Sequence, residues 1–262
     1  MASKEREILA ACTSGQMCAL EKIFKELNMG PDHPKTPYSI DKNIPDDQRP
    51  VSVEDMLMAA IEGKQVETIT FLCKTFPDSH FYGAPMRAAI QTGDVQVLRE
   101  VCKQDPSVAS QEMGDDETVN ALGYAASRPN GDGLIKVLLD SGANPNEPPP
   151  FPMPSCWNVS AAVVGGLPTS TFEQFFDAGF SCNDPHVARL AVEKKRPDVL
   201  EVLFARGKNI PGAYFPPKED LIKAANETNN SEIVANINQL YAEHQAKPKK
   251  GLLTNLMDKF RS

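Results

Sequence analysis

The sequence lacks the cysteine pairs and the histidine spacing that mark most protein metal sites. Its six cysteines include no Cys-x-x-Cys pair, and its four histidines are scattered along the 262 residues. Most of the cysteines stand in apolar stretches typical of helices, where a free thiol behaves as a small hydrophobic group. We therefore expect no metal, no cofactor and no disulfide framework, and we expect a reducing compartment.

Long apolar runs are missing as well. No stretch approaches the roughly 18 consecutive apolar residues of a membrane-spanning helix, and the first residues carry charges where a signal peptide would carry its apolar segment. These features predict a cytoplasmic protein. Two short basic runs, 194–196 and 247–250, resemble nuclear-import signals and leave a nuclear location open.

Basic residues are outnumbered by acidic ones. The chain has 27 Lys and Arg against 35 Asp and Glu, which gives a formal charge of -8 and argues against a nucleic-acid-binding protein. No catalytic arrangement is evident, because the carboxylates at 46–47 and 115–117 fall in polar loops and the adjacent glycines at 165–166 lack a phosphate-binding spacing. We predict a protein without enzymatic activity.

What the sequence does contain is a recurring pattern of two helices joined by a turn. The clearest copy runs from Thr118 to Asn146, where an Ala-Ala pair at 125–126 closes the first helix and an apolar run at 134–139 forms the second. Another copy, 84–101, has Pro85 in the first helical turn and Gly93 between its helices. Small residues allow two helices to approach closely, and glycine permits a left-handed turn.

The pattern recurs seven times when each copy is aligned on one apolar position of its second helix. Those positions are Leu20, Ile69, Leu98, Ile135, Phe172, Leu200 and Val234. In this alignment Gly15, Gly63 and Gly93 occupy the turn, while Lys195 and Asn229 replace the glycine in the last two copies. The second, fourth and fifth copies carry one extra turn residue, and Asp94 and Asp198 are placed to cap second helices.

This order of Ala pair, turn glycine and apolar run resembles the ankyrin repeat, whose period is about 33 residues. The resemblance implies an all-α, helix-turn-helix solenoid over residues 1–244, followed by a basic linker and a short amphipathic helix in 245–262. The family's signature histidine is missing, with Gly123 in its place in the clearest copy. An irregular helical bundle is the alternative to this fold.

The ankyrin resemblance also implies a monomeric scaffold or adaptor that binds a protein partner through its concave face. In this family the partner contacts the exposed ends of the first helices and the finger loops between repeats. Carried over by alignment, the helix-end residues are Gln91, Thr92, Ser127, Arg128, Glu193 and Lys194. The expected finger residues are Tyr82 and Phe151, with fingers near Tyr38, Phe81-Tyr82 and Phe151.

Two segments have alternative interpretations. The proline run 148–152 favours polyproline II, either as a stiff finger, which we favour, or as a ligand for an aromatic-groove domain. Near the C-terminus, five apolar residues share one helical face: Leu252, Leu253, Leu256, Met257 and Phe260. We favour a cap over the end of the last repeat, and the alternative is a membrane-peripheral adaptor that uses this basic amphipathic helix.

Overall fold

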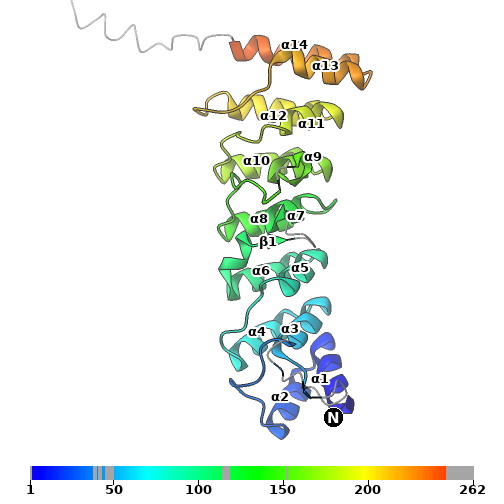
Figure 1. The fold of residues 1–262 in the computed structure, drawn as a ribbon, viewed down its shortest axis with the longest axis vertical. Helices are drawn as coiled ribbons and strands as arrows, with labels where there is room; N and C mark the ends of the chain where they lie inside the picture. The colour runs from blue at the N-terminus through cyan, green and yellow to red at the C-terminus, as the bar shows by residue number, and fades with distance from the viewer. Residues whose placement is uncertain are drawn as a thin grey trace, which may run out of the picture. The chain divides into compact units, whose positions relative to one another are not determined.

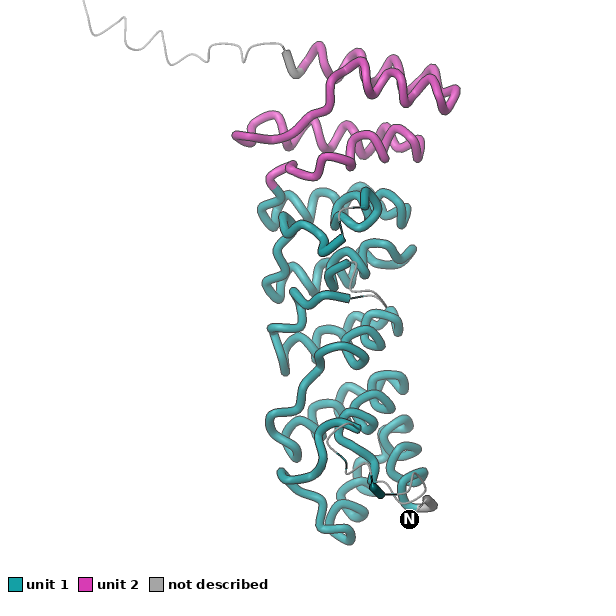
Figure 2. Tube along the Cα trace, in the orientation of Figure 1, with its two compact units in different colours: residues 1–180 teal, residues 181–262 magenta. Residues whose placement is uncertain are grey.

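The computed structural model describes residues 2–37, 40, 43–44, 50–113, 119–151 and 153–245. It divides into two compact units, unit 1 (Met1–Phe180) and unit 2 (Ser181–Ser262), which Figure 2 distinguishes by colour. The predicted C-terminal helix in 251–260, the finger residue Tyr38 and most of the loop around it lie outside the described residues.

Helices joined in pairs account for most of the described chain. In unit 1 these helices are α1 (Ala2–Ser14), α2 (Met17–Glu26), α3 (Val53–Glu62), α4 (Val66–Thr75), α5 (Ala84–Gln91), α6 (Val95–Gln104), α7 (Ala121–Ala126), α8 (Asp132–Asp140), α9 (Asn158–Val164) and α10 (Thr169–Asp177). In unit 2 they are α11 (Val187–Glu193), α12 (Pro197–Gly207), α13 (Lys218–Glu227) and α14 (Ser231–Gln245). Unit 1 also contains the 3-10 helices η3 (Pro106–Ser110) and η4 (Pro154–Cys156) and the strands β1 (Glu112–Met113) and β2 (Val119–Asn120).

Within each unit the pairs stack in two rows, as Figure 1 shows. In unit 1 the first helices α1, α3, α5, α7 and α9 contact one another in order, and the second helices α4, α6, α8 and α10 do the same. In unit 2, α11 contacts α13 and α12 contacts α14. The prediction of an all-α fold of ankyrin-like helix-turn-helix repeats is confirmed. The short antiparallel pair β1–β2, which the sequence analysis did not foresee, forms a finger between the third and fourth helix pairs.

The residues on which the repeats were aligned form the core. Leu20, Ile69, Leu98, Ile135, Phe172 and Leu200 all have 0% of their surface exposed. The seventh position was wrong by one residue. Val234 is only half-buried, whereas Ile233 and Ile237 of the same helix are buried. Burial of this row is expected where helix pairs stack, because no single pair could bury it alone.

Most of the predicted turn residues adopt the left-handed backbone conformation. Gly93 has a φ of +66°, and the two replacements of glycine, Lys195 and Asn229, have φ values of +56° and +51°. The prediction for the second turn was wrong, because Gly63 has an ordinary φ of -74° and Lys64 takes the positive value of +57°. With the turn centred on Lys64, the second pair needs no extra residue.

Gly63 is explained by a close approach of two backbones. A Cβ atom on Gly63 would lie 2.1 Å from the carbonyl oxygen of Thr13, at the end of the preceding first helix. The same reason applies to Gly165, where a Cβ would lie 2.4 Å from the carbonyl oxygen of Ala126. Two physical demands therefore select glycine in these turns, left-handed backbone at some positions and contact between first helices at others.

Of the two predicted helix caps, one is confirmed and the other is wrong. Asp94 is the N-cap of α6, and its carboxylate accepts hydrogen bonds from the backbone N–H groups of Gln96 (2.9 Å) and Val97 (3.2 Å). The prediction for Asp198 was wrong, because the N-cap of α12 is Arg196 and Asp198 lies within the first turn. There the guanidinium of Arg196 donates to its carboxylate at 2.7 Å and lowers the pKa of Asp198.

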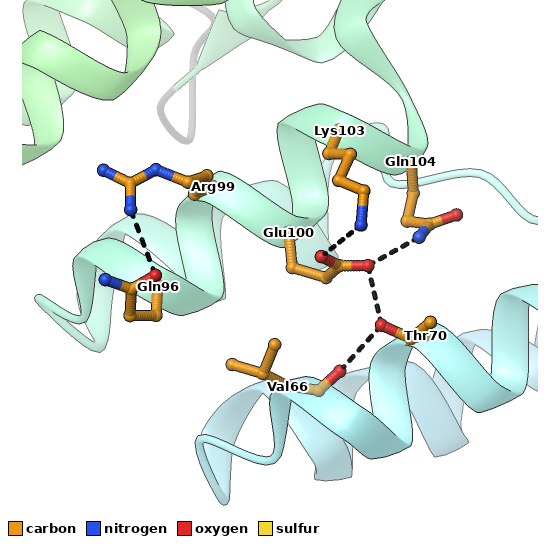
Figure 3. A network of polar contacts seen from close by, with 7 residues as sticks. All are labelled: Val66, Thr70, Gln96, Arg99, Glu100, Lys103 and Gln104. Atoms are coloured by element: carbon orange, nitrogen blue, oxygen red, sulfur yellow. Dashed lines mark hydrogen bonds and ion pairs between the residues drawn. The ribbon is translucent and has the colours of Figure 1, made fainter.

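A buried carboxylate connects two second helices of unit 1. The Oε1 atom of Glu100 on α6 accepts hydrogen bonds from the Thr70 hydroxyl on α4 (2.7 Å) and from the Gln104 amide (2.6 Å), as drawn in Figure 3. Its Oε2 atom accepts from the Lys103 ammonium at 3.2 Å. Both oxygens are occupied by structural partners, so this carboxylate holds α4 and α6 together.

Candidate partner-binding surface

The predicted binding residues fall in the loops that precede first helices and in the turns that follow them. Four of them end first helices of unit 1: Gln91 ends α5, Thr92 follows it, and Ser127 and Arg128 follow α7. Tyr82 and Phe151 lie in finger loops of unit 1. The remaining two, Glu193 and Lys194, lie at the end of α11 in unit 2.

The structure brings two of these residues together through a tyrosine. The side-chain amide of Gln91 donates a 2.9 Å hydrogen bond to the hydroxyl of Tyr124 on α7. The guanidinium carbon of Arg128 lies 5.2 Å from the centroid of the same ring. We call these three residues the Tyr124 cluster. It joins the ends of α5 and α7 and fixes the ring from both its edge and its face.

The cation of the Tyr124 cluster is available for a partner. Within the residues that the structure describes, the Arg128 side chain forms no ion pair or hydrogen bond, and it is half-exposed. Stacking over the tyrosine limits its rotamers and leaves the planar N–H donors free to face a carboxylate. An oriented arginine beside an aromatic ring can therefore recognise an acidic side chain with two parallel hydrogen bonds.

Thr92 and Ser127 have local roles at the ends of their helices. The hydroxyl of Thr92 donates to the carbonyl oxygen of Ala89 (2.8 Å) and accepts from the backbone N–H of Asp94 (3.1 Å). The hydroxyl of Ser127 donates to the carbonyl oxygen of Tyr124 at 2.9 Å. These bonds stabilise the two turns that carry the Tyr124 cluster, so the hydroxyl groups of both residues have a structural role.

Sequence reasoning missed Tyr124, the residue that organises the cluster. It lies four residues before Arg128, and residues with this spacing on a helix face each other. Its neighbours Gly123 and Ala125 are buried, while Tyr124 itself is half-exposed. A search for aromatic residues one turn before the charged helix ends would have found it.

The finger residues divide into core and surface. Tyr82 has 61% of its surface exposed and Phe151 has 49%, in agreement with their predicted positions on the surface. Phe81 is fully buried, so its prediction as a finger residue was wrong: this ring packs in the core beneath the start of α5. Met153, which was not predicted, adds a second exposed apolar side chain beside Phe151, with 48% exposed.

At its tip, the proline-rich finger before α9 forms a turn closed by a backbone hydrogen bond. The backbone N–H of Met153 donates to the carbonyl oxygen of Phe151 at 2.9 Å, a bond that polyproline II does not contain. At the base, the buried amide of Asn158 donates to the carbonyl oxygens of Glu147 (3.3 Å) and Asn144 (3.5 Å). The finger therefore presents Phe151 and Met153 from an anchored loop.

Unit 2 has its own hollow between α11 and α13. Its volume is about 340 Å³, and Arg189, Tyr214 and Asp220 contribute to its lining. The predicted residue Glu193 pairs with Arg189 at 2.7 Å, and this hydrogen bond raises the pKa of the Arg189 guanidinium. Lys194 is exposed beyond the end of α11. Sequence reasoning missed Tyr214, which has 44% of its surface exposed.

The described residues contain no group of three or more His, Cys, Asp or Glu side chains that could hold a metal ion. Burial raises the pKa of the thiols of Cys12, Cys73 and Cys182 to about 12 and that of Cys102 to about 11, so these thiols are protonated at neutral pH. No helix in the described part of the chain is long and apolar enough to cross a membrane.

Comparison with solved structures finds a similar chain in an ankyrin repeat protein from Leishmania major. The two are 12% identical, the match covers 91% of this chain and 98% of that chain, and the TM-score is 0.41. No family model matches the chain, and no curated protein sequence matches it. The helix-pair repeats described above, and not this distant similarity, establish the fold.

Proposed function

We propose that this protein is a non-enzymatic interaction module that binds a partner protein through the first-helix ends and finger loops of unit 1. The observation that carries the proposal is the Tyr124 cluster, in which Arg128 is oriented over a tyrosine and is free of ion pairs within the described residues. Tyrosine and arginine are the residues most enriched among those that dominate binding energy in protein interfaces.

A cluster that is already ordered lowers the entropic cost of binding a partner. A mobile arginine loses rotamer freedom when it is fixed in an interface, at about 0.5–1.5 kcal/mol per side chain. Here Gln91 already holds the ring of Tyr124, and the ring already holds Arg128. A partner carboxylate therefore meets a cation that has lost part of that freedom on folding, and the partner is expected to present an acidic residue at this point.

The exposed finger residues supply the apolar part of the contact. Tyr82 and Phe151 lie in the loops that precede α5 and α9, whereas the Tyr124 cluster lies at the C-terminal ends of α5 and α7. A partner that lies along the row of first helices contacts both the finger residues and the Tyr124 cluster. This division into aromatic anchors and an oriented charge is typical of protein interfaces.

Affinity purification with quantitative identification of bound proteins tests the proposal. Arg128→Ala and Gln91→Ala are compared with the wild-type chain, and Lys194→Ala asks whether unit 2 takes part. Lys136→Ala is the matched control, because Lys136 is an exposed second-helix cation that pairs only with Asp140 of its own helix.

We expect Arg128→Ala to lower recovery of the partner about tenfold or more, in line with a loss of at least 1.4 kcal/mol. Gln91→Ala should give a smaller loss, because it frees the ring without removing the cation. Equal recovery with all three test variants and the control would assign the partner to another surface. A thermal melt of each variant separates lost binding from lost folding.

A further inference from the structure

A groove runs along the second-helix side of unit 2, away from the first-helix ends. It lies between α12 and α14, which contact each other, and its volume is about 370 Å³. One wall is a stripe of α12 from Glu201 to Lys208, and the other is a stripe of α14 from Asn236 to Glu243. In each stripe the lining residues are spaced i, i+3, i+4 and i+7, so each wall is a single helical face.

The dimensions of the groove suit a helix. Seven residues of rise correspond to a length of about 10 Å, or two helical turns. Two neighbouring helices that present parallel stripes form the kind of groove into which the apolar face of a third helix packs. The required occupant is therefore a short amphipathic segment with apolar residues over about two turns.

The groove has apolar side chains along its middle and a net acidic charge at only one end. Phe204, Ala205 and Leu240 form the apolar part. Glu201 lies at one end, where it accepts a 2.9 Å hydrogen bond from the Asn236 amide. At the other end Lys208, which follows α12, offsets the charge of Glu243 of α14. An occupant with basic residues at the Glu201 end fits these charges.

We propose that the C-terminal segment 251–260 of this same chain docks in the groove. Its sequence predicts one apolar face, from Leu252 to Phe260, that extends over about 12 Å as a helix. Basic residues flank that face on both sides: Lys247, Lys249 and Lys250 precede it, and Lys259 and Arg261 end it. Asp258 is the only acidic residue of 246–262, so the basic end of the segment at Lys259 and Arg261 is complementary to the Glu201 end of the groove.

Chain connectivity sets the direction of docking. Helix α14 ends at Gln245, just beyond Glu243 at one end of the groove. The residues 246–250 can span up to about 17 Å, which is enough to reverse the chain, and Pro248 and Gly251 both favour a break before the segment. The docked segment then runs antiparallel to α14. This direction places the Lys259 region near Glu201, and the Lys249 region at the end where Glu243 and Lys208 lie.

The last helix pair shows no exposed large apolar side chain among the described residues. Those that are exposed are Leu27, Tyr82, Phe151, Met153, Val164 and Tyr214, and none of them belongs to α13 or α14. Ile222 of α13 and Val234 of α14 are half-buried. The groove between α12 and α14 offers the apolar face of 251–260 a complementary surface.

Hydrogen exchange of the full chain, followed by mass spectrometry, tests the docking. We expect the amides of 252–260 to exchange at least tenfold more slowly than in an unstructured peptide. Ala205→Lys puts a charge on the groove floor and should abolish that protection. Ala235→Lys is the matched control, because Ala235 is an exposed alanine of α14 that does not line the groove.

A charge reversal gives a second, independent readout. Glu201→Lys should weaken the protection of 252–260, and the further changes Lys259→Glu and Arg261→Glu should restore it. Fast exchange of the segment in the wild-type chain overturns the proposal, as does protection that survives Ala205→Lys. Protection that depends on protein concentration would assign the occupant to a second copy, and protection only with anionic phospholipid vesicles would assign the segment to a membrane surface. Either result overturns docking within one chain.

Discussion

The hydroxyl of Thr70 on α4 lies 2.7 Å from the carboxylate of Glu100 on α6 and donates a hydrogen bond to it. Burial of the Glu100 side chain, of which 10% is exposed, is the largest effect on its pKa and raises it. Hydrogen bonds from Thr70, Gln104 and Lys103 together outweigh burial, so the pKa of Glu100 lies below its usual range. Glu100 is therefore an ionised structural group at neutral pH and a poor general acid.

The first prediction concerns the removal of this hydrogen bond. Thr70→Val keeps the shape of the side chain and leaves the buried carboxylate without one donor. We expect the free energy of unfolding to fall by about 1–2 kcal/mol at pH 7, measured by urea denaturation. Thr75→Val is the control, because Thr75 on the same helix bonds only to the carbonyl oxygen of Phe71. A loss no larger than that of the control would contradict the structural role of Glu100.

The second prediction is the pH dependence of that loss. Because the pKa of Glu100 is lowered by folding, its stabilising contribution is present above the pKa of the unfolded chain, about 4.3. The contribution is lost as the pH falls through the lower pKa of the folded chain. The difference in stability between the wild-type chain and Thr70→Val should therefore be constant near neutral pH and shrink below about pH 4. Urea denaturation at several pH values measures it.

The third prediction separates the two reasons for glycine in the turns. Gly63→Ala adds a Cβ atom against the carbonyl oxygen of Thr13, so we expect a loss of about 1–3 kcal/mol despite the ordinary backbone conformation. Lys64→Gly relieves a left-handed residue and should be neutral or stabilising by up to about 1 kcal/mol. Thermal unfolding of the two variants gives the comparison. A smaller loss of stability for Gly63→Ala than for Lys64→Gly would mean that Gly63, and not Lys64, is the residue at the left-handed turn position.

The fourth prediction concerns the close contact between the fourth and fifth helix pairs. Ala126 is fully buried, and its carbonyl oxygen lies where a side chain on Gly165 would be. Ala126→Leu should overpack this contact and cost about 1–3 kcal/mol in the free energy of unfolding. Ala235→Leu, the same change at an exposed alanine of α14, is the control. A neutral Ala126→Leu would mean that the helices can separate there without penalty.

The sequence was sufficient for the fold because each repeat shows its period in several residue types at once. Ala pairs, apolar runs and turn glycines recur together, and the buried positions from Leu20 to Leu200 were identified correctly. The errors fall where two physical reasons select the same residue. Gly63 looked like a left-handed turn glycine but is required by contact with Thr13, and only coordinates distinguish these causes.

The candidate surface was less accessible to sequence reasoning. The helix-end positions of Gln91 and Arg128 follow from the repeat alignment, but their connection through Tyr124 depends on how α5 and α7 pack. The β1–β2 finger was also missed, since strands of two residues give no periodic signal. Phe81 is buried and the adjacent Tyr82 is exposed, a difference that composition alone does not predict.

The fifth prediction tests how the finger loop of unit 2 is held. The hydroxyl of Tyr241 on α14 donates a hydrogen bond to the carbonyl oxygen of Pro216, two residues after the exposed Tyr214. The backbone N–H of Tyr214 itself donates to the carbonyl oxygen of Cys182 at 2.8 Å. Both bonds fix the loop that presents Tyr214. Tyr241→Phe should therefore cost about 1 kcal/mol, because a buried carbonyl oxygen loses its donor.

The alkaline pH dependence of Tyr241 gives a sharper test than the loss at pH 7. Burial, the largest cause, raises the pKa of Tyr241 to about 12, and the charges of Glu219 and Asp220 add to the shift. A raised pKa means that the neutral phenol stabilises the fold fully below the unfolded value of about 10 and less as the pH rises towards 12. Tyr241→Phe removes this dependence, so the two chains should converge in stability above pH 10. Tyr82→Phe, at an exposed tyrosine of unit 1, should instead leave the alkaline profile of the wild-type chain unchanged.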